Sequence, residues 1–247
     1  MSECLVLENV SRAFGGLRAV DGVNLTIRSG ERRAVLGPNG AGKTTLFNLV
    51  SGELAATGGR IVWFGSDITR LAPHRRAALG IARTFQITRL FRNMTVAENV
   101  LLASQALDPR KFAMHRPLTS YPDLVRRATD LMEQFGLITL QHERASHLAY
   151  GDQRKLEVAL TMAGRPRLLL LDEPMAGLSA AERDAIQTLL AKLDPSIAVL
   201  LIEHDVDVAF AFAETITVLA QGRVLAEGPK HEVSANPAVQ EIYLGTC

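Results

Sequence analysis

The stretch of sequence that decides the fold is rich in glycine and reads Gly37-Pro38-Asn39-Gly40-Ala41-Gly42-Lys43-Thr44. It fits the pattern G-x-x-x-x-G-K-[ST] at every fixed position. A predicted strand at residues 33–36 precedes it, and a helix-forming run at residues 43–50 follows it. Strand, loop and helix in this order are the context in which the pattern forms a phosphate-binding loop.

The residue types in this loop suit the binding of a triphosphate. Backbone N–H groups in a glycine-rich turn can surround phosphate oxygens, and the N-terminus of the following helix favours negative charge. We expect Lys43 to reach the β- and γ-phosphate oxygens and Thr44 to bind Mg²⁺, with Thr45 completing the predicted nucleotide contacts. The sequence therefore predicts a nucleoside triphosphate site. Kinases, GTPases and motor ATPases all share this loop, so other motifs must decide among them.

Two adjacent carboxylates follow the apolar run at residues 168–171. In α/β sheets, ligands bind at the carboxyl ends of the strands. We expect Asp172 to hold Mg²⁺ and Glu173 to polarise the attacking water, since hydrolysis of a phosphoanhydride needs both roles. An ordinary solvated strand end is the alternative. His204 follows the apolar run at residues 198–202 and could donate to the γ-phosphate, with a structural histidine as the alternative.

The composition of the chain favours one large folded unit in a reducing compartment. Of 247 residues, 47% are hydrophobic, which is enough to bury a substantial core. Lys and Arg number 27 against 26 Asp and Glu, so the net charge of +1 gives no general attraction to nucleic acid or anionic lipid. Cys4 and Cys247 fit neither a disulfide framework nor a metal cluster. No apolar run approaches about 18 residues, so we expect any work at a membrane to go through a docked partner subunit.

Apolar runs predict two kinds of sheet. Short β-like runs predict an antiparallel sheet near the N-terminus, at residues 5–10, 23–27 and 60–64. Fully apolar runs predict parallel strands covered on both faces, at residues 168–171, 198–202 and 216–219. The first two of these are joined by a predicted helix that starts with a capping box at Ser179 and Glu182. Its buried stripe is expected at Ile186, Leu189, Leu190 and Leu193.

Residues 87–163 have helical periodicity and predict a helical lobe inserted into the α/β core. Thr95 and Glu98 form a capping box. One helical face ends at Gly136 and consists of Leu124, Ala128, Leu131, Met132 and Phe135. A loop is expected where prolines interrupt the pattern, at Pro109, Pro117 and Pro122.

With these motifs in this order, the chain resembles the ABC ATPase family over essentially its whole length. Thr84-Phe85-Gln86 resembles the Q-loop, whose glutamine contacts Mg²⁺ and senses the transmembrane partner. His204 is similar to the switch histidine, and residues 176–179 are similar to the D-loop. Phe14 resembles the aromatic residue that stacks on adenine, and a core phenylalanine is the alternative.

The resemblance implies an α/β fold with a P-loop NTPase core, which is a RecA-like, mostly parallel sheet. An N-terminal antiparallel β subdomain and an inserted α-helical subdomain complete it. Residues 1–247 would form a single ABC ATPase domain. The core with the antiparallel subdomain is expected at residues 1–86 and 164–247, and the helical subdomain with the signature motif at residues 87–163.

Residues 149–153, Ala-Tyr-Gly-Asp-Gln, occupy the place of the signature motif, usually Leu-Ser-Gly-Gly-Gln, before a helix expected to begin near Arg154. Tyr150 replaces the serine whose hydroxyl commonly meets the γ-phosphate, and Asp152 stands where glycine is usual. The helix N-terminus can still offer N–H donors, and we expect Asp152 to point away from the phosphate. In the family this motif closes over nucleotide bound to the other subunit. Gly151 and Gln153 are expected to act in this way, and Tyr150 and Asp152 are counted with them as nucleotide-binding residues.

Several stretches are similar to the ATPases of branched-chain amino acid importers in particular. They are residues 83–86, 90–91 and 94–99, the Tyr-Gly-x-Gln form of the signature, residues 202–205, and a tail from Asn236-Pro237 to Tyr243-Leu244-Gly245. The resemblance implies two transmembrane permease subunits, a second ATPase subunit in a heterodimer or homodimer, and a periplasmic solute-binding protein. It also implies a peripheral position at the cytoplasmic face of the bacterial inner membrane. Leu90 and Phe91 would lie where the membrane subunit docks, with lobe core as the alternative.

The expected function is the binding and hydrolysis of ATP with Mg²⁺, coupled to uptake of branched-chain amino acids or similar small polar solutes. Importers of urea or short amides share much of the pattern and remain an alternative. A non-transport ABC ATPase usually carries two cassettes or a long coiled-coil insertion, and this sequence has neither. A small-molecule phosphotransferase is a further alternative, but it would need an acceptor pocket and a lid, whereas this chain has a signature-like motif and Glu173 suited to activate water. The last alternative is a module that binds nucleotide but catalyses little. The presence of all the catalytic motif residues argues against it: Lys43, Gln86, Asp172, Glu173 and His204.

Overall fold

The structure is a computed structural model that describes residues 2–84, 90–108 and 117–244. Contacts within the chain divide it into two compact units. Unit 1 comprises Met1–Ile81, Arg167–Glu173 and Asp194–Cys247, and unit 2 comprises Ala82–Pro166 and Pro174–Leu193. The single-domain division with a helical subdomain at residues 87–163 stays a prediction.

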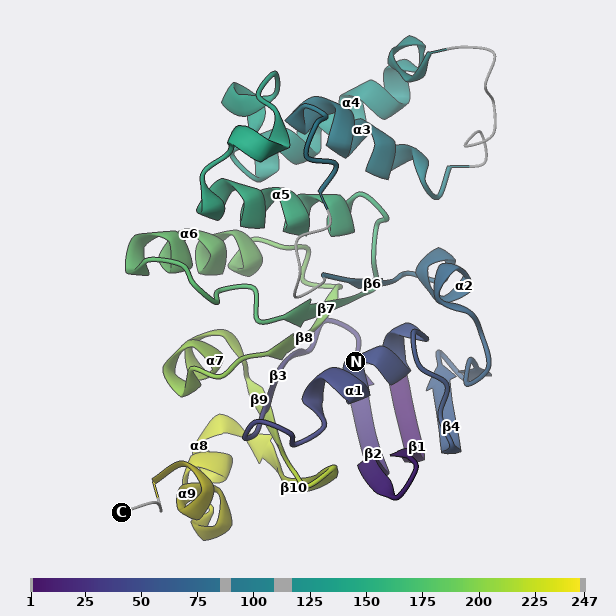
Figure 1. Ribbon diagram of the computed structural model, residues 1–247, viewed down its shortest axis with the longest axis vertical. Helices are drawn as coiled ribbons and strands as arrows, with labels where there is room; N and C mark the ends of the chain where they lie inside the picture. Colours follow the sequence, from purple (N-terminus) through teal and green to yellow (C-terminus); the bar gives the residue numbers. More distant parts are fainter. Residues whose placement is uncertain (1, 85–89, 109–116, 245–247) are drawn as a thin grey trace. The chain divides into compact units, whose positions relative to one another are not determined.

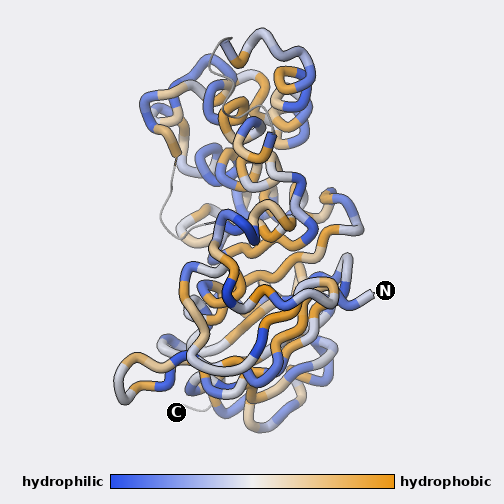
Figure 2. Tube along the Cα trace, turned by 90° about the vertical axis from the view of Figure 1, so that its right-hand side faces the viewer, coloured by the Kyte–Doolittle hydropathy of each residue, from blue (hydrophilic) through white to orange (hydrophobic). Residues whose placement is uncertain are grey.

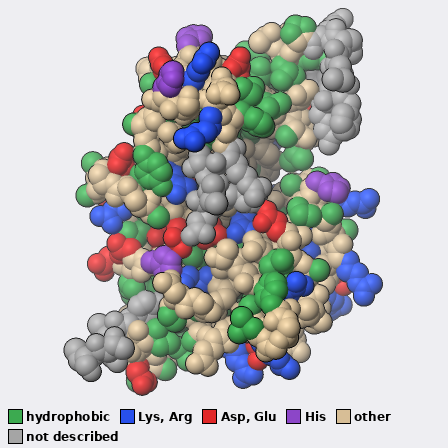
Figure 3. Space-filling model, viewed as in Figure 1, with side chains coloured by type: hydrophobic (Ala, Val, Ile, Leu, Met, Phe, Trp, Pro, Cys, Tyr) green, Lys and Arg blue, Asp and Glu red, His purple; other side chains and the backbone are tan. Residues whose placement is uncertain are grey.

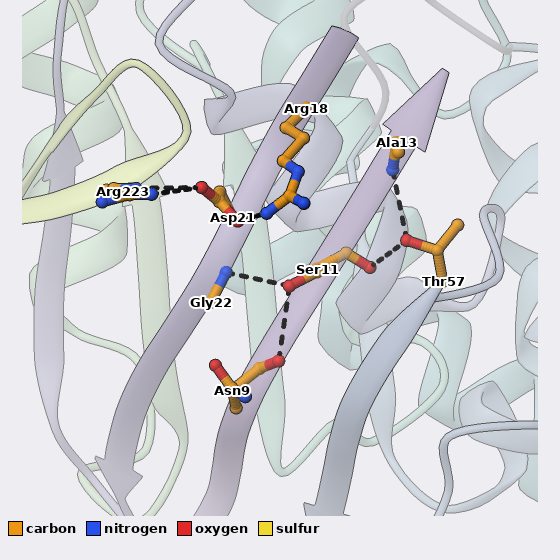
Figure 4. Close-up of polar contacts among 8 residues, drawn as sticks. All are labelled: Asn9, Ser11, Ala13, Arg18, Asp21, Gly22, Thr57 and Arg223. Atoms are coloured by element: carbon orange, nitrogen blue, oxygen red, sulfur yellow. Dashed lines mark hydrogen bonds and ion pairs between the residues drawn. The ribbon is translucent and has the colours of Figure 1, made fainter. Parts of the chain in front are cut away.

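The first sheet of unit 1 is antiparallel, as the short β-like runs predict, with the strand order β2-β1-β4-β5. Its strands are β1 (Glu3–Phe14), β2 (Leu17–Arg28), β4 (Gly58–Trp63) and β5 (Ser66–Asp67). Register shifts interrupt the pairing of β1 near Ser11. Side-chain hydroxyls replace backbone carbonyls as hydrogen-bond acceptors at this point. Ser11 Oγ accepts from Gly22 N at 2.9 Å, and Thr57 Oγ1 accepts from Ala13 N at 3.2 Å (Figure 4). These two backbone N–H groups thus stay paired despite the irregular strand.

The second sheet has the strand order β10-β9-β3-β8-β7-β6. Its strands are β3 (Arg32–Leu36), β6 (Ile81–Arg83), β7 (Leu168–Asp172), β8 (Ala198–Ile202), β9 (Thr215–Ala220) and β10 (Arg223–Pro229). The pairs β7–β8, β3–β8 and β3–β9 are parallel, so the predicted parallel sheet is confirmed. β10 runs antiparallel to β9 and was not predicted, because its residues alternate between exposed and half-buried and include three charged or glycine positions.

Alternate residues of β3 face two different apolar clusters, so this sheet is covered on both faces. Val35 joins the cluster of the antiparallel sheet and helix α1 (Lys43–Ser51). Ala34 and Leu36 join a cluster formed with α7 (Val206–Phe212), α8 (Lys230–Ser234) and α9 (Pro237–Leu244). Figure 1 shows these helices with the strands they accompany, and Figure 2 shows long hydrophobic stretches along the strands. Cys4 lies in the first cluster, where burial raises the pKa of its thiol to about 11.

A buried arginine joins the C-terminus of α1 to helix α2 (Pro73–Ala78). The Arg76 side chain donates to Leu49 O at 2.6 Å and Val50 O at 2.9 Å, both in the last turn of α1. It also donates to Thr69 O and Leu71 O, and Arg76 is only 1% exposed. Burial lowers the pKa of Arg76 to about 10, so the group is still charged at neutral pH. Its charge therefore stabilises carbonyls that have no partner within the helix.

Unit 2 contains helices α3 (Val96–Gln105), α4 (Pro122–Gln134), α5 (Tyr150–Met162) and α6 (Ala180–Ala191). Short 3₁₀ helices occur at Leu118–Ser120, Ile138–Leu140 and Ala145–His147. Both predicted capping boxes are confirmed, at the starts of α3 and α6. The predicted face of α4 is buried, and Gly136 follows it with φ 65°. Pro122 is at the start of α4 and does not interrupt a helix, because the first turn needs no N–H there; Pro109 lies outside the described residues.

The surface mixes both signs of charge. On the face drawn in Figure 3, Lys and Arg side chains are interspersed with Asp and Glu. This distribution agrees with the formal net charge of +1. Over the ranges that the structure describes, no helix combines the length and the apolar character needed to cross a membrane.

Candidate functional site

The glycine-rich loop lies between the end of β3 and the start of α1, as predicted. Pro38, Asn39 and Gly40 are exposed, and Ala41 is buried beneath them. Thr44 is exposed and Thr45 half-buried in the first turn of α1. The loop thus presents its backbone and the Thr44 hydroxyl to solvent while its base is anchored in unit 1.

Lys43 folds back over its own loop. Its Nζ donates to Gly37 O at 2.6 Å and to Pro38 O at 3.0 Å, and the side chain is 6% exposed. Burial lowers the pKa of Lys43, while the negative charges of Glu173 and then Asp172 oppose that shift. Lysine and carboxylates are therefore near enough to interact electrostatically, as a shared phosphate site requires.

Gly42 is the N-cap of α1, and its position requires glycine. Its φ is 101°, and a Cβ there would lie 2.2 Å from Ala19 O, a backbone atom of β2. A side chain at this position would have to displace a strand, because real contacts of this kind do not come so close. The antiparallel sheet thus fixes where the helix N-terminus begins.

The loop also contacts the turn between β9 and β10, which none of the predicted motifs includes. Gly222 N donates to Ala41 O at 3.0 Å, and Asp21 N donates to Gly222 O at 2.8 Å. Figure 4 shows the Asp21 carboxylate between Arg223, whose Nη2 is 2.6 Å away, and Arg18, whose Nη1 is 2.9 Å away. Hydrogen bonds from Arg223 and then from Arg18 lower the pKa of Asp21. This turn therefore ties β2 to the back of the phosphate-binding loop.

We predict that Gly222→Ala weakens nucleotide binding. A Cβ at Gly222 would lie 2.9 Å from Ala19 O, and φ is 79°. Strain and clash together are expected to cost about 1–3 kcal/mol and to shift the turn that holds Ala41. Equilibrium dialysis with ATP should give a dissociation constant raised about tenfold if 1.4 kcal/mol of this falls on binding.

Gly65→Ala is the matched control for this prediction. Gly65 has the same φ of 79°, but a Cβ there meets nothing within 4 Å. Its ATP affinity should equal that of the parent, since any backbone strain lies far from the loop contact. Equal affinity of the Gly222 and Gly65 variants would contradict the proposed support.

The predicted acidic pair lies at the carboxyl end of β7. Asp172 is the last residue of that strand and is 1% exposed. Glu173 follows with φ 49°, a left-handed conformation that is uncommon for a residue with a side chain. Its N–H donates to Ile202 O at the end of β8 at 3.0 Å. Backbone strain of this kind gathers at functional sites.

His204 and Glu173 are in direct contact. His204 Nε2 lies 2.6 Å from Glu173 Oε1, and the two side chains are 47% and 15% exposed. His204 follows β8, which pairs with both β7 and β3. The structure thus brings together two predicted catalytic residues at the ends of adjacent strands.

Phe14, at the end of β1, is 44% exposed, so it is not a core phenylalanine. The guanidinium of Arg12 lies 4.6 Å from the centre of its ring. Arg12 is held in turn by a hydrogen bond from Nη1 to Ala55 O at 2.8 Å. The ring is therefore supported by a cation and accessible at the surface, as an aromatic platform for a base would be.

The signature residues begin helix α5 in unit 2. The helix starts at Tyr150 and not near Arg154, so the expected boundary is wrong and the motif forms the first turn. Asp152 Oδ1 accepts from Lys155 Nζ at 2.8 Å, and Gln153 Nε2 donates to Leu148 O at 2.9 Å. The Asp152 carboxylate is thus neutralised by a lysine on its own helix.

The Q-loop and the predicted docking residues lie only partly within the described residues. Thr84 is buried in unit 2, whereas Gln86 lies outside the described residues. Leu90 is buried at 9% exposure, so for this residue lobe core is correct. Phe91 is 55% exposed, and its N–H donates to Asn99 Oδ1 at 3.0 Å. Phe91 therefore presents an apolar ring at the surface of unit 2.

The donor set in unit 1 suits a magnesium ion. Thr44 offers a hydroxyl and Asp172 a carboxylate, and Mg²⁺ is bound by such hard oxygen ligands together with phosphates and water. Within the described ranges, no group of three or more His, Cys, Asp or Glu side chains could hold a metal ion. The Thr44 hydroxyl and the Asp172 carboxylate are the kind of oxygen ligand that Mg²⁺ takes beside a phosphate.

Known proteins match almost the whole chain. The family model described as ABC transporter matches residues 20–176, and the model described as branched-chain amino acid ATP-binding cassette transporter matches residues 223–246. The high-affinity branched-chain amino acid transport ATP-binding protein BraF of Pseudomonas aeruginosa is 40% identical and covers 98% of this chain and 97% of its own length. LivG of Escherichia coli K12, described in the same words, is 40% identical and covers 99% of each chain.

A solved structure agrees with the fold. The ADP conformation of MJ1267, an ATP-binding cassette of an ABC transporter, matches with a TM-score of 0.88 and 31% identity over 99% of this chain and 100% of that chain. The expected α/β fold with a phosphate-binding loop is confirmed by this likeness and by the two sheets of unit 1. One family model spans more than half of the sequence, and relatives are 40% identical along nearly all of it. The chain therefore belongs to the ABC transporter family, as one of its ATP-binding cassettes.

Proposed function

We propose that the chain hydrolyses ATP to drive uptake of branched-chain amino acids through a membrane transporter. The observation that carries the catalytic part is the contact between Glu173, which follows Asp172 at the end of β7, and His204, which follows β8. β8 lies between β7 and β3, the strand that leads into the phosphate-binding loop. The solute is supported by the match at residues 223–246 and by relatives named for branched-chain amino acid transport.

In the proposed reaction, water attacks the γ-phosphorus of ATP and the bond to the β–γ bridging oxygen breaks, which gives ADP and inorganic phosphate. Glu173 polarises the attacking water and takes its proton, while His204 holds the Glu173 carboxylate and donates to the γ-phosphate. Lys43 leaves the carbonyls of its own loop to bind the β- and γ-phosphate oxygens. Phe14 stacks on adenine.

Magnesium would be held by Thr44 and Asp172, with Gln86 as the third predicted ligand. When bound, the ion neutralises negative charge on the β- and γ-phosphate oxygens. The near-complete burial of Asp172 at 1% exposure supports this role, because a buried carboxylate gains from a nearby cation.

The proposed working assembly contains two ATPase subunits paired head to tail. The first turn of α5 in one subunit, at residues 150–153, would cover the nucleotide of the other, with N–H groups of the helix N-terminus facing the phosphate. Two permease subunits and a periplasmic binding protein complete the transporter, with the ATPases at the cytoplasmic face of the inner membrane. The exposed ring of Phe91 supports a docked membrane subunit.

We predict that Glu173→Gln lowers ATP hydrolysis by about 10²–10⁴-fold, the usual contribution of a positioned base, while ATP binding persists. Because ATP then stays bound, size-exclusion chromatography with ATP and Mg²⁺ should show a dimer. Glu133→Gln is the matched control, since Glu133 is an exposed glutamate on α4. Monomers of the Glu173 variant at high concentration with ATP would count decisively against the head-to-tail scheme.

The transport part has its own experiment. The protein is purified from membranes with its partners, and recovery of permease-like subunits is expected. Uptake of labelled leucine into vesicles that hold the complex should then depend on internal ATP and should not be reduced by excess urea. Recovery with ribosomes or DNA would contradict the transport proposal, and competition by urea would contradict the proposed solute.

A further inference from the structure

The signature turn of unit 2 contacts the D-loop of the same unit. Tyr150 Oη donates to Ala176 O at 3.3 Å. The tyrosine ring also lies against Gly177, where a Cβ would come within 3.4 Å of Tyr150 Cε1. The hydroxyl that stands where serine is usual is therefore directed toward this chain's own D-loop.

Two further bonds fix the orientation of the Tyr150 hydroxyl. Arg154 donates to Tyr150 Oη from both Nε, at 3.2 Å, and Nη2, at 2.8 Å. The hydroxyl oxygen thus accepts from the guanidinium, and its single hydrogen is left to donate to Ala176 O. Arg154 is itself held by Glu157 Oε2 at 2.8 Å, with both side chains less than a tenth exposed. A buried ion pair therefore aims the tyrosine at the D-loop.

A second connection joins the same two segments. Glu182 accepts from Ser179 N at 2.9 Å as part of the capping box of α6. Its other oxygen, Oε1, would lie 2.5 Å from a Cβ on Gly151, which shows how closely the first turn of α5 approaches it. Hydrogen bonds from Ser179 and then from the Gly151 N–H hold the pKa of Glu182 below its usual range. The carboxylate that caps α6 thus also lies against the N-terminal turn of α5.

The D-loop follows directly on the predicted catalytic residue, since only Pro174 and Met175 separate Glu173 from Ala176. In the proposed dimer, Glu173 acts on the nucleotide of its own subunit, and the signature turn acts on the nucleotide of the other. Contact between the signature turn and the D-loop is therefore a short route between the two ATP sites.

We propose that Tyr150 is a positioning residue, whose hydroxyl makes the signature turn and the D-loop of one subunit move together when ATP closes the dimer. This proposal rests on the proposed function. Ordering the two segments in advance lowers the entropic cost of closure. The Tyr150 hydroxyl already makes three bonds within its own subunit. Backbone N–H groups of α5 are then left to bind the anion.

The test compares Tyr150→Phe and Tyr150→Ser in a Glu173→Gln parent. The dissociation constant of the ATP-driven dimer is measured by light scattering, and the ATP affinity of the monomer by dialysis. Loss of the hydroxyl in Tyr150→Phe should raise the dimer dissociation constant by up to about tenfold, since one hydrogen bond contributes on this scale. Tyr150→Ser should weaken the dimer at least as much, because its short side chain cannot reach Ala176. The ATP affinity of the monomer should not change in either variant.

Hydrogen exchange in the monomer provides a readout that does not depend on dimer formation. Amides at residues 176–178 should exchange faster in Tyr150→Phe than in the parent. Thr129→Val is the matched control, because it removes a hydroxyl of the same unit that donates only within its own helix, to Val125 O at 3.1 Å. Its dimer affinity and its exchange should equal those of the parent.

The outcomes separate the two proposals. If the parent dimerises with ATP and Tyr150→Phe does so equally well, with unchanged exchange at residues 176–178, the coupling role is overturned and the proposed function stands. Full dimer affinity in Tyr150→Ser would also overturn it, since a serine hydroxyl would then act on phosphate as in other cassettes. If the parent itself stays monomeric with ATP, the proposed function fails and the coupling role fails with it.

Discussion

Replacement of Lys43 by methionine should lower ATP hydrolysis by roughly 10²–10³-fold, the usual effect of removing a preorganised donor from developing negative charge. The side chain lies at the base of the phosphate-binding loop, where it bonds Gly37 O and Pro38 O. Methionine has a similar stem but no charge to place between the β- and γ-phosphates. Phosphate release measures the rate, and equilibrium dialysis should show weaker ATP binding.

The same change should leave the fold intact. Burial is the largest cause of the lowered pKa of Lys43, so the charged group is partly desolvated and its removal relieves that cost. The midpoint of thermal unfolding should therefore stay the same or rise. Lys192→Met, at an exposed position after α6, is the control and should hydrolyse ATP at the parent rate. A Lys43→Met protein with parent activity would remove Lys43 from the proposed mechanism.

The second large effect is expected on stability. Arg76→Met should lower the free energy of unfolding by about 3–5 kcal/mol, as is usual when one partner of a buried charged network is removed. Four carbonyl oxygens of α1 and of the segment before α2 would lose their donor, and each unsatisfied buried group is costly. Urea unfolding followed by circular dichroism measures the change.

Neighbouring Arg75 supplies the control for this prediction. Arg75 is exposed on the same helix, so Arg75→Met should change the free energy of unfolding by no more than about 0.5 kcal/mol. Arg76→Lys keeps the charge but cannot reproduce the planar set of donors, so its stability should lie between those of the parent and Arg76→Met. Equal losses in the Arg75 and Arg76 methionine variants would show that these carbonyl contacts are not what stabilises the end of α1.

Local signals in the sequence were enough to predict much of the fold. The capping boxes at Thr95 and Ser179 each combine two residues three positions apart, so they can be recognised without knowledge of the rest of the chain. The apolar runs of β7 and β8 are equally local, and these strands are fully buried. The position of Glu173 beside His204 follows from them, because neighbouring parallel strands end at the same edge.

Features that depend on distant parts of the chain were not predicted. The start of α5 lacks a capping side chain at Ala149, and Glu182 in another helix approaches its first turn instead. The sequence also cannot distinguish Arg76 from Arg75, because its buried carbonyl partners come from residues before α2 and from another helix. Likewise, the sequence around Gly222 indicates only a turn, and its hydrogen bond to Ala41 of the phosphate-binding loop appears only in the structure.

The close approach of β2 to Gly42 changes what that glycine reveals about evolution. Because Ala19 O would clash with any side chain there, architecture alone demands glycine at position 42, whether or not a nucleotide ever binds. Descendants of such a cassette that lost catalysis would keep Gly42 and could freely exchange Lys43. In relatives that have lost some of the motifs, a retained lysine at this position would therefore indicate ATPase activity. A retained glycine would indicate only that the fold is kept.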